Sequence, residues 1–186
     1  RAFRSSNGAM STTGSGTLTI NAIVASTTTA NRGAALFEGS TISTGTGALN
    51  VNVTMTTNGA NGFHFSTPQS TLSSTSGNIT LTNLTTSYTN TDVFNTLTAN
   101  TGGTIRITSN SPSYSSTALN GAGPVFIEPA GTSFNSPVTF PASGLTVGTG
   151  HSALTIGKSG NTQTLTMTGT TAVAGNLTTY AGATTI

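Results

Sequence analysis

Short runs in which apolar residues alternate with threonine recur along the whole chain. Alternation with a period of two places the apolar side chains on one face of a strand. Threonine is itself a favoured strand residue, and 43 of the 186 residues are threonine. Glycine, asparagine, proline and serine, the usual turn residues, separate the runs. The pattern therefore predicts an all-β fold, with strands that include residues 17–20, 49–55, 79–82, 105–108 and 154–156.

Some of these runs also repeat. Residues 77–82 (Gly-Asn-Ile-Thr-Leu-Thr) match residues 103–108 (Gly-Thr-Ile-Arg-Ile-Thr) at a shift of 26. The shift from Val51 to Ile79 is 28, and the shift from Ile105 to Val125 is 20. Irregular periods of this size are typical of a solenoid that carries loops on one face. We therefore expect a β-solenoid of roughly eight coils with about 20–25 residues each.

Two segments depart from the strand pattern. Residues 27–37 are expected to hold a short helical turn, and residues 110–120 are expected to form an exposed loop. Neither expectation changes the predicted fold class.

Charged residues are nearly absent, at 4% of the chain. In a stack of parallel coils, like charges would recur every ~4.8 Å and repel one another. A solenoid therefore explains the composition better than a β-sandwich, which is the alternative fold. The five basic residues do not cluster as nucleic-acid binding requires, and no apolar run approaches the ~18 residues of a membrane span. The chain contains no cysteine, so disulfides and thiolate metal sites are excluded.

The C-terminal part contains a series of recognisable motifs. They are Gly-Pro-Val-Phe-Ile-Glu-Pro at 123–129, Phe-Pro at 140–141, Leu-Thr-Val at 145–147, Leu-Thr-Ile-Gly-Lys-Ser-Gly-Asn-Thr at 154–162 and Ala-Val-Ala-Gly-Asn-Leu-Thr-Thr-Tyr-Ala-Gly at 172–182. In this order, residues 123–186 resemble the β-strand repeat of filamentous-haemagglutinin-like bacterial surface exoproteins. The resemblance implies a right-handed parallel β-helix, secretion to the cell surface, and a role in adhesion or in extracellular fibres.

We expect residues 1–186 to form one β-solenoid segment of a longer chain or filament. In this interpretation residues 123–186 are the best-matched repeat region. Residues 1–16 match the pattern least and are a candidate extended arm.

Few residues could support catalysis. His64 and Asp92 could join a serine in a triad, but no motif such as Gly-x-Ser-x-Gly marks a nucleophile. Glu38 and Glu128 could cleave a glycosidic bond only if their carboxylates lay ~5–10 Å apart. His64 is more simply an outward strand residue between two phenylalanines, and His151 stands alone in a glycine-rich turn. The sequence therefore predicts no catalytic, cofactor-binding or metal site.

Four asparagines begin an Asn-x-Thr triplet, the acceptor pattern for N-glycosylation. A strand that alternates with threonine also produces this triplet by chance, so the triplet alone does not predict a bound sugar. The four are Asn52, Asn78, Asn83 and Asn176.

Three functions are compatible with these observations. The first is a structural or adhesive extracellular surface protein, a β-helical stalk or fibre-forming segment without catalysis. The second is a β-sandwich filament subunit that donates residues 1–16 as a strand to its neighbour. The third is a polysaccharide-active β-helix enzyme that uses Glu128. The expected partners are further copies or further repeats, and a host-surface or carbohydrate receptor, but neither nucleic acid nor membrane.

Overall fold

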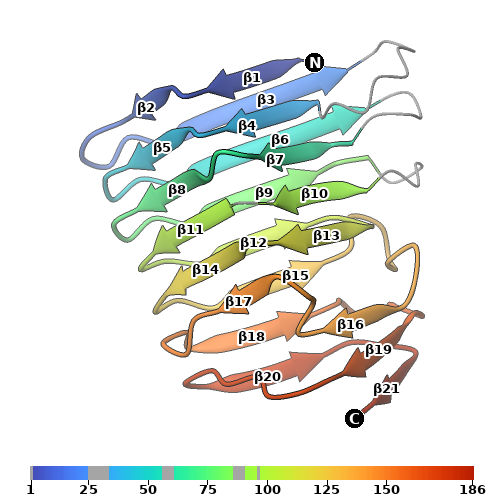
Figure 1. Ribbon diagram of the computed structural model, residues 1–186. Coiled ribbons are helices and arrows are strands. Elements are labelled where there is room, and N and C mark those ends of the chain that lie inside the picture. The colour runs from blue at the N-terminus through green and yellow to red at the C-terminus, as the bar shows by residue number, and fades with distance from the viewer. Residues whose placement is uncertain (1, 25–33, 56–60, 86–90, 96) are drawn as a thin grey trace.

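A computed structural model describes residues 2–24, 34–55, 61–85, 91–95 and 97–186, which form strands and turns and contain no helix (Figure 1). Three long sheets run along the molecule, and a short terminal sheet follows them. The first sheet contains β1 (Phe3–Ser6), β4 (Ala35–Glu38), β7 (Phe63–Ser66), β10 (Asp92–Asn95) and β13 (Pro112–Ser115). The second contains β2 (Ala9–Ser11), β5 (Thr41–Thr44), β8 (Ser70–Ser74), β11 (Leu97–Thr101), β14 (Thr117–Gly121) and β17 (Leu145–Val147).

The third sheet is the longest. It contains β3 (Leu18–Val24), β6 (Leu49–Met55), β9 (Ile79–Asn83), β12 (Ile105–Thr108), β15 (Val125–Glu128), β18 (Ala153–Ile156) and β20 (Asn176–Thr179). The terminal sheet contains β16 (Val138–Phe140), β19 (Thr164–Met167) and β21 (Ala183–Thr185).

Each of the first twelve strands pairs in parallel with the strand three places further along the chain. The chain therefore winds through the three sheets in turn and completes five coils, from β1–β3 to β13–β15 (Figure 1). The predicted parallel β-helix is confirmed. The alternative β-sandwich is not formed, since every strand pair among the described residues is parallel.

The sequence predicted roughly eight coils, whereas the structure completes five. The coils differ in length because the links from the third sheet back to the first range from residues 109–111 to residues 25–34. The shifts of 26 and 20 are confirmed as strand registers, Ile79 with Ile105 and Ile105 with Val125. The shift of 28 was wrong, because Ile79 pairs with Leu49.

Of the two local exceptions, the predicted loop needs correction, and the predicted helical turn lies mostly outside the described residues. Residues 110–120 contain β13 and β14 rather than a loop, because pairing with β10 and β11 imposes strand geometry on a serine-rich segment. For the predicted helical turn, residues 27–33 lie outside the described residues, and Ala35–Phe37 belong to β4. Residues 3–11, within the candidate arm, form β1 and β2 and pair with β4 and β5 in the first two coils.

Inward side chains form columns that run along the stack. In the third sheet one column is Leu18, Leu49, Ile79, Ile105, Val125, Leu154 and Leu177. In the first sheet the column is aromatic, with stacked or tilted rings at centroid distances of 4.6–5.9 Å: Phe3, Phe37, Phe65, Phe94 and Tyr114. Burial of apolar side chains is the main driving force for folding, so these columns hold the coils together.

A column of glycines explains why the repeated motif begins with glycine. At the corner between the second and third sheets, a Cβ on Gly77 would lie 2.0 Å from the carbonyl oxygen of Gly47. A Cβ on Gly103 would likewise lie 2.5 Å from the oxygen of Gly77, and one on Gly123 2.0 Å from that of Gly103. None of these three glycines has a positive φ. Glycine is needed here for close approach of successive coils and not for its backbone conformation.

Hydroxyl groups satisfy the polar backbone at the same corner. The Ser74 hydroxyl donates to the Gly47 oxygen at 3.0 Å and accepts from the Gly77 amide at 2.9 Å. Thr44 and Thr101 occupy the same register position on their own coils and also bond to corner glycines. Buried backbone groups without partners are costly, so this column of hydroxyls stabilises the tight corner.

Candidate functional site

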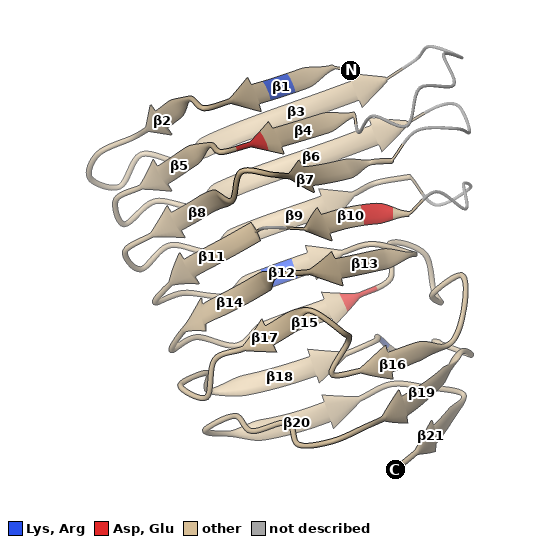
Figure 2. Cartoon of the chain, in the orientation of Figure 1, with Lys and Arg blue, Asp and Glu red and all other residues tan. Residues whose placement is uncertain are grey.

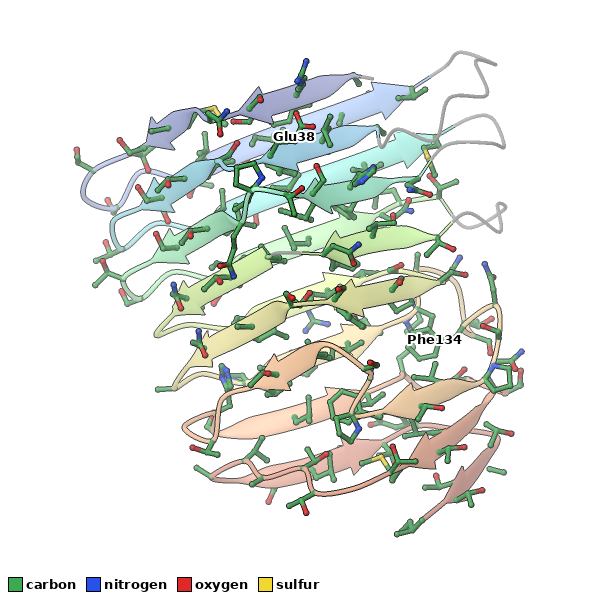
Figure 3. All side chains as sticks on the ribbon, in the orientation of Figure 1. Glu38 and Phe134 are labelled. Atoms are coloured by element: carbon green, nitrogen blue, oxygen red, sulfur yellow. The ribbon has the colours of Figure 1, made fainter. Side chains whose placement is uncertain are left out.

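The two glutamates lie far apart in the stack, on different sheets. Glu38 ends β4 in the second coil, where its Oε2 is 2.9 Å from Nη2 of Arg4 on β1 (Figures 2 and 3). Glu128 ends β15 in the fifth coil, where its Oε1 is 2.6 Å from Nη1 of Arg106 on β12. The structure therefore does not bring these two carboxylates together as a glycosidase pair requires.

Both ion pairs join strands of neighbouring coils. Arg106 also places its guanidinium 4.1 Å from the ring centroid of Phe126, the residue beside it on the next strand. Figure 2 shows the few charged residues of the described chain spread along the stack. Opposite charges on adjacent coils attract where like charges would repel, and partly exposed pairs of this kind contribute about 0–1 kcal/mol each.

Asp92 is fully buried and faces the interior of the first sheet. Its carboxylate accepts hydrogen bonds from the Phe63 amide at 2.7 Å, from Asn83 Nδ2 at 3.0 Å and from the Ser109 hydroxyl at 2.5 Å. Burial raises the pKa of the carboxyl above its ordinary value, although these hydrogen bonds act in the opposite direction. The hydrogen bonds tie together β7, β9 and the link after β12. Asp92 is therefore positioned to join coils.

The two histidines have different environments. His64 points outward from β7, because Phe63 and Phe65 on either side face the core. It does not share a face with Asp92, so the imagined triad is not assembled. His151 is fully buried, with Nδ1 2.7 Å from the oxygen of Gly123 and Nε2 3.0 Å from the oxygen of Leu119.

His151 takes the place of the next hydroxyl in the column at the corner between the second and third sheets. Gly121 occupies the register position of Thr101 but has no side chain to bond the corner carbonyls. A Cβ on Gly121 would lie 3.5 Å from Cε1 of His151, so the imidazole reaches the corner that Gly121 leaves empty. The sequence indicated only a histidine in a turn, because its partners come from the preceding coil.

The four Asn-x-Thr asparagines are not equally accessible. Asn78 and Asn176 are exposed and Asn52 is half-buried, with its Nδ2 2.9 Å from Oδ1 of Asn21. Asn83 is buried against Asp92 and cannot take a sugar in the folded chain. Among the residues that the structure describes, no group of acidic, histidine or cysteine side chains is arranged to hold a metal ion. The same residues include no helix that could cross a membrane.

A cavity of about 460 Å³ lies where the first sheet ends. In the described part of the chain, β13 pairs with β10 on one side and has no strand partner on the other. The next strand that does not continue one of the three long sheets, β16, begins the terminal sheet. Residues 129–137 link β15 to β16, and Phe134 in this link lies near the space between β13 and β16 (Figure 3). Tyr114, Phe134 and Phe140 all line the cavity.

Sequence reasoning predicted no site and therefore missed this cavity. One available signal was the position of Tyr114, which follows Phe65 and Phe94 in the aromatic column at spacings of 29 and 20 residues. The interruption after β13 left a weaker signal in the prolines at 112 and 137, since proline within sheets is confined mostly to edges.

The chain matches no protein-family model, no curated protein and no solved structure. The resemblance of residues 123–186 to filamentous-haemagglutinin-like exoproteins therefore stays a prediction.

Proposed function

We propose that the chain is a structural segment of an extracellular bacterial surface protein. It would act as a β-helical stalk or fibre element that serves adhesion and performs no catalysis. The observation that carries this proposal is the continuous stack, in which seven parallel strands of the third sheet follow one another in register. In such repeat structures each coil contacts only its neighbours, so adding coils extends a rod without altering the coils already present.

The outer faces of the stack support a role in contact with other surfaces. Asparagine side chains bond from coil to coil, with 2.9 Å between Asn52 and Asn21 and 3.0 Å between Asn120 and Asn100. These polar, mostly uncharged faces offer amides and hydroxyls to a receptor. A carbohydrate or a host-surface protein is therefore the receptor class that we propose.

The last strand of the third sheet supports association with further coils. Leu177 on β20 continues the apolar column from Leu154, yet 44% of it is exposed. A strand edge with an exposed apolar side chain favours pairing with another strand. We propose that another coil, from a second copy or from further repeats, covers this face.

Sedimentation velocity over a range of concentrations tests this association. Leu177→Lys should abolish concentration-dependent growth of the sedimentation coefficient, because a charge would enter the apolar contact. Thr178→Lys is the matched control, since it places the same charge on the outward face of the same strand and should leave association intact. If the native chain stays monomeric throughout, or if both variants behave alike, stacking through β20 is wrong.

Two further measurements test the rest of the proposal. Fibre diffraction of the assembled material should give a reflection near 4.8 Å along the fibre axis. Beads coated with the chain should adhere to immobilised carbohydrates or host cells, and failure on both would contradict the adhesive role. The proposal also expects no release of reducing sugar from a panel of polysaccharides. Turnover that Glu128→Gln abolishes would instead support the enzymatic alternative.

A further inference from the structure

Hydrogen bonds hold one wall of the cavity in place, although that wall is part of the long link between β15 and β16. The buried Asn110 accepts from the Gly131 amide on its Oδ1 and from the Asn135 amide on its backbone oxygen, both at 2.9 Å. The Phe134 amide, between these two donors in the chain, donates to Oδ1 of Asn161 at 3.3 Å. The link is therefore tied to the segment before β13 on one side and to the segment after β18 on the other.

A space of this size beside the core is unusual. Protein interiors are closely packed, with few voids larger than a water molecule. This cavity has a volume of about 460 Å³, within the range of small-molecule sites. Side chains that border a void lose the packing contacts that a neighbour would supply. A ligand that fills the cavity would provide those contacts.

The lining changes from apolar to polar between the floor of the cavity and its mouth. Ile127, Phe134 and Phe140 line the cavity and are only 2–3% exposed, so they form its floor. Ser136 and Thr139 also line it but are exposed, so they lie at its mouth. Burial of an apolar group is favourable at the floor, whereas the hydroxyl groups at the mouth can exchange hydrogen bonds with a polar group.

The charge of the lining narrows the class of ligand further. Among the residues that the structure describes, no charged side chain lines the cavity. Bringing an ion into such surroundings without a counter-charge would be costly. A free sugar is uncharged, but it would leave the apolar floor without a partner. A molecule with an apolar body and an uncharged polar end matches both parts of the lining.

We propose that the cavity is a binding site for an uncharged amphiphile. Its apolar body lies on the floor formed by Ile127, Phe134 and Phe140, and its hydroxyl-bearing end lies at the mouth beside Ser136 and Thr139. A neutral glycoside with an apolar substituent belongs to this class. The site requires neither stacking through β20 nor adhesion by the outer faces, so failure of this proposal and failure of the stalk role are distinguishable.

Ligand-observed nuclear magnetic resonance titration of the folded chain tests the site with three probes, each below its micelle concentration. Hexyl β-D-glucoside has the apolar body and the uncharged end, methyl β-D-glucoside lacks the body, and hexyl sulfate carries a charge at the end. Hexyl glucoside should saturate the native chain at millimolar concentration. The other two probes should bind at least about tenfold more weakly, because one buries little apolar area and the other brings an ion to an uncharged lining.

A substitution that fills part of the space locates the binding. Ala142 lines the cavity and is half-buried, so the larger side chain in Ala142→Leu should weaken hexyl glucoside binding at least about fivefold by displacing part of the apolar body. Ala122→Leu is the matched control on an exposed alanine outside the cavity and should leave binding unchanged. Circular dichroism checks that each variant retains its β-sheet.

A second variant at an exposed position keeps the test valid if Ala142→Leu does not fold. Thr139→Lys places an ammonium group at the mouth and should raise the affinity for hexyl sulfate relative to hexyl glucoside about threefold. The proposal is overturned if hexyl glucoside does not saturate the native chain, or if methyl glucoside or hexyl sulfate binds as tightly. It is also overturned if a folded Ala142→Leu binds hexyl glucoside as the native chain does, or if Thr139→Lys leaves the ratio of the two affinities unchanged.

Discussion

Adding a single methyl group to one glycine of the corner column should weaken the stack strongly. In Gly77→Ala the new Cβ would lie 2.0 Å from the carbonyl oxygen of Gly47, about 1.4 Å closer than ordinary van der Waals contact. The blocking atom is backbone, so no side-chain rotation can relieve the overlap. The second and third coils must separate locally.

The cost follows from what that separation disturbs. Forcing extra atoms into a well-packed region typically costs 1–3 kcal/mol. The hydrogen bonds from the Leu49 amide to the Asn78 oxygen (2.8 Å) and from Ser74 to Gly47 (3.0 Å) would also stretch, at roughly 1 kcal/mol each. Alanine lowers the entropy of the unfolded chain and returns about 0.4–1 kcal/mol. The expected net loss in the free energy of unfolding is about 3 kcal/mol.

Urea unfolding followed by far-ultraviolet circular dichroism measures this loss. The matched control is Gly131→Ala, where the nearest atom to a new Cβ is 3.7 Å away and φ is not positive. That variant should change the free energy of unfolding by no more than about 0.5 kcal/mol. If Gly77→Ala costs no more than Gly131→Ala, close approach is not the reason for the glycine column.

Substitutions at three further positions, with their controls, probe other parts of the stack by urea unfolding. Phe65→Ala should lower the free energy of unfolding by about 3–5 kcal/mol, because it empties the middle of the aromatic column. Phe65→Leu should cost less than about 1.5 kcal/mol. Equal losses in the two variants would contradict the column's importance. His151→Ala should cost about 2 kcal/mol, because it removes the hydrogen bond to the Gly123 carbonyl oxygen and empties a buried position, a larger loss than for the outward-facing residue in His64→Ala. Because the pKa of Asp92 is raised in the folded state, the stability of the native chain relative to Asp92→Asn should be greatest below about pH 3.8 and should fall as the pH rises through the folded-state pKa. A relative stability that rises over this range would show that the sign of the shift is wrong.

The regular coils could be predicted from the sequence because local pattern and tertiary pairing agree there. Residues 79–82 and 105–108 alternate with the same period and follow a corner glycine, so their register appears directly as a shift of 26. Residues 112–115 contain only one large apolar side chain, Tyr114, and their strand depends on pairing with β10. Local pattern alone could not indicate it.

The buried polar residues were beyond sequence reasoning for a different reason. The partners of Asp92 and His151 are supplied by other coils, so neither burial nor hydrogen bonding is encoded near these residues in the chain. The cavity is harder still, because it arises where β13 does not pair with a following strand. A sequence pattern can indicate that a strand forms, but it gives no sign that a strand pair is missing.

The links between the third and the first sheet differ in length, so insertions there should have a different effect from insertions at the glycine corner. The link after β12 has only residues 109–111, whereas the link after β3 spans residues 25–34, yet both precede strands that pair in register with their neighbours. Extra residues at this corner therefore do not shift the columns, since loop lengthening costs little free energy. A foreign epitope inserted at this corner, away from the buried Ser109 and Asn110, would be displayed at a fixed height on a rigid scaffold. The same insertion at the glycine corner would dismantle the scaffold.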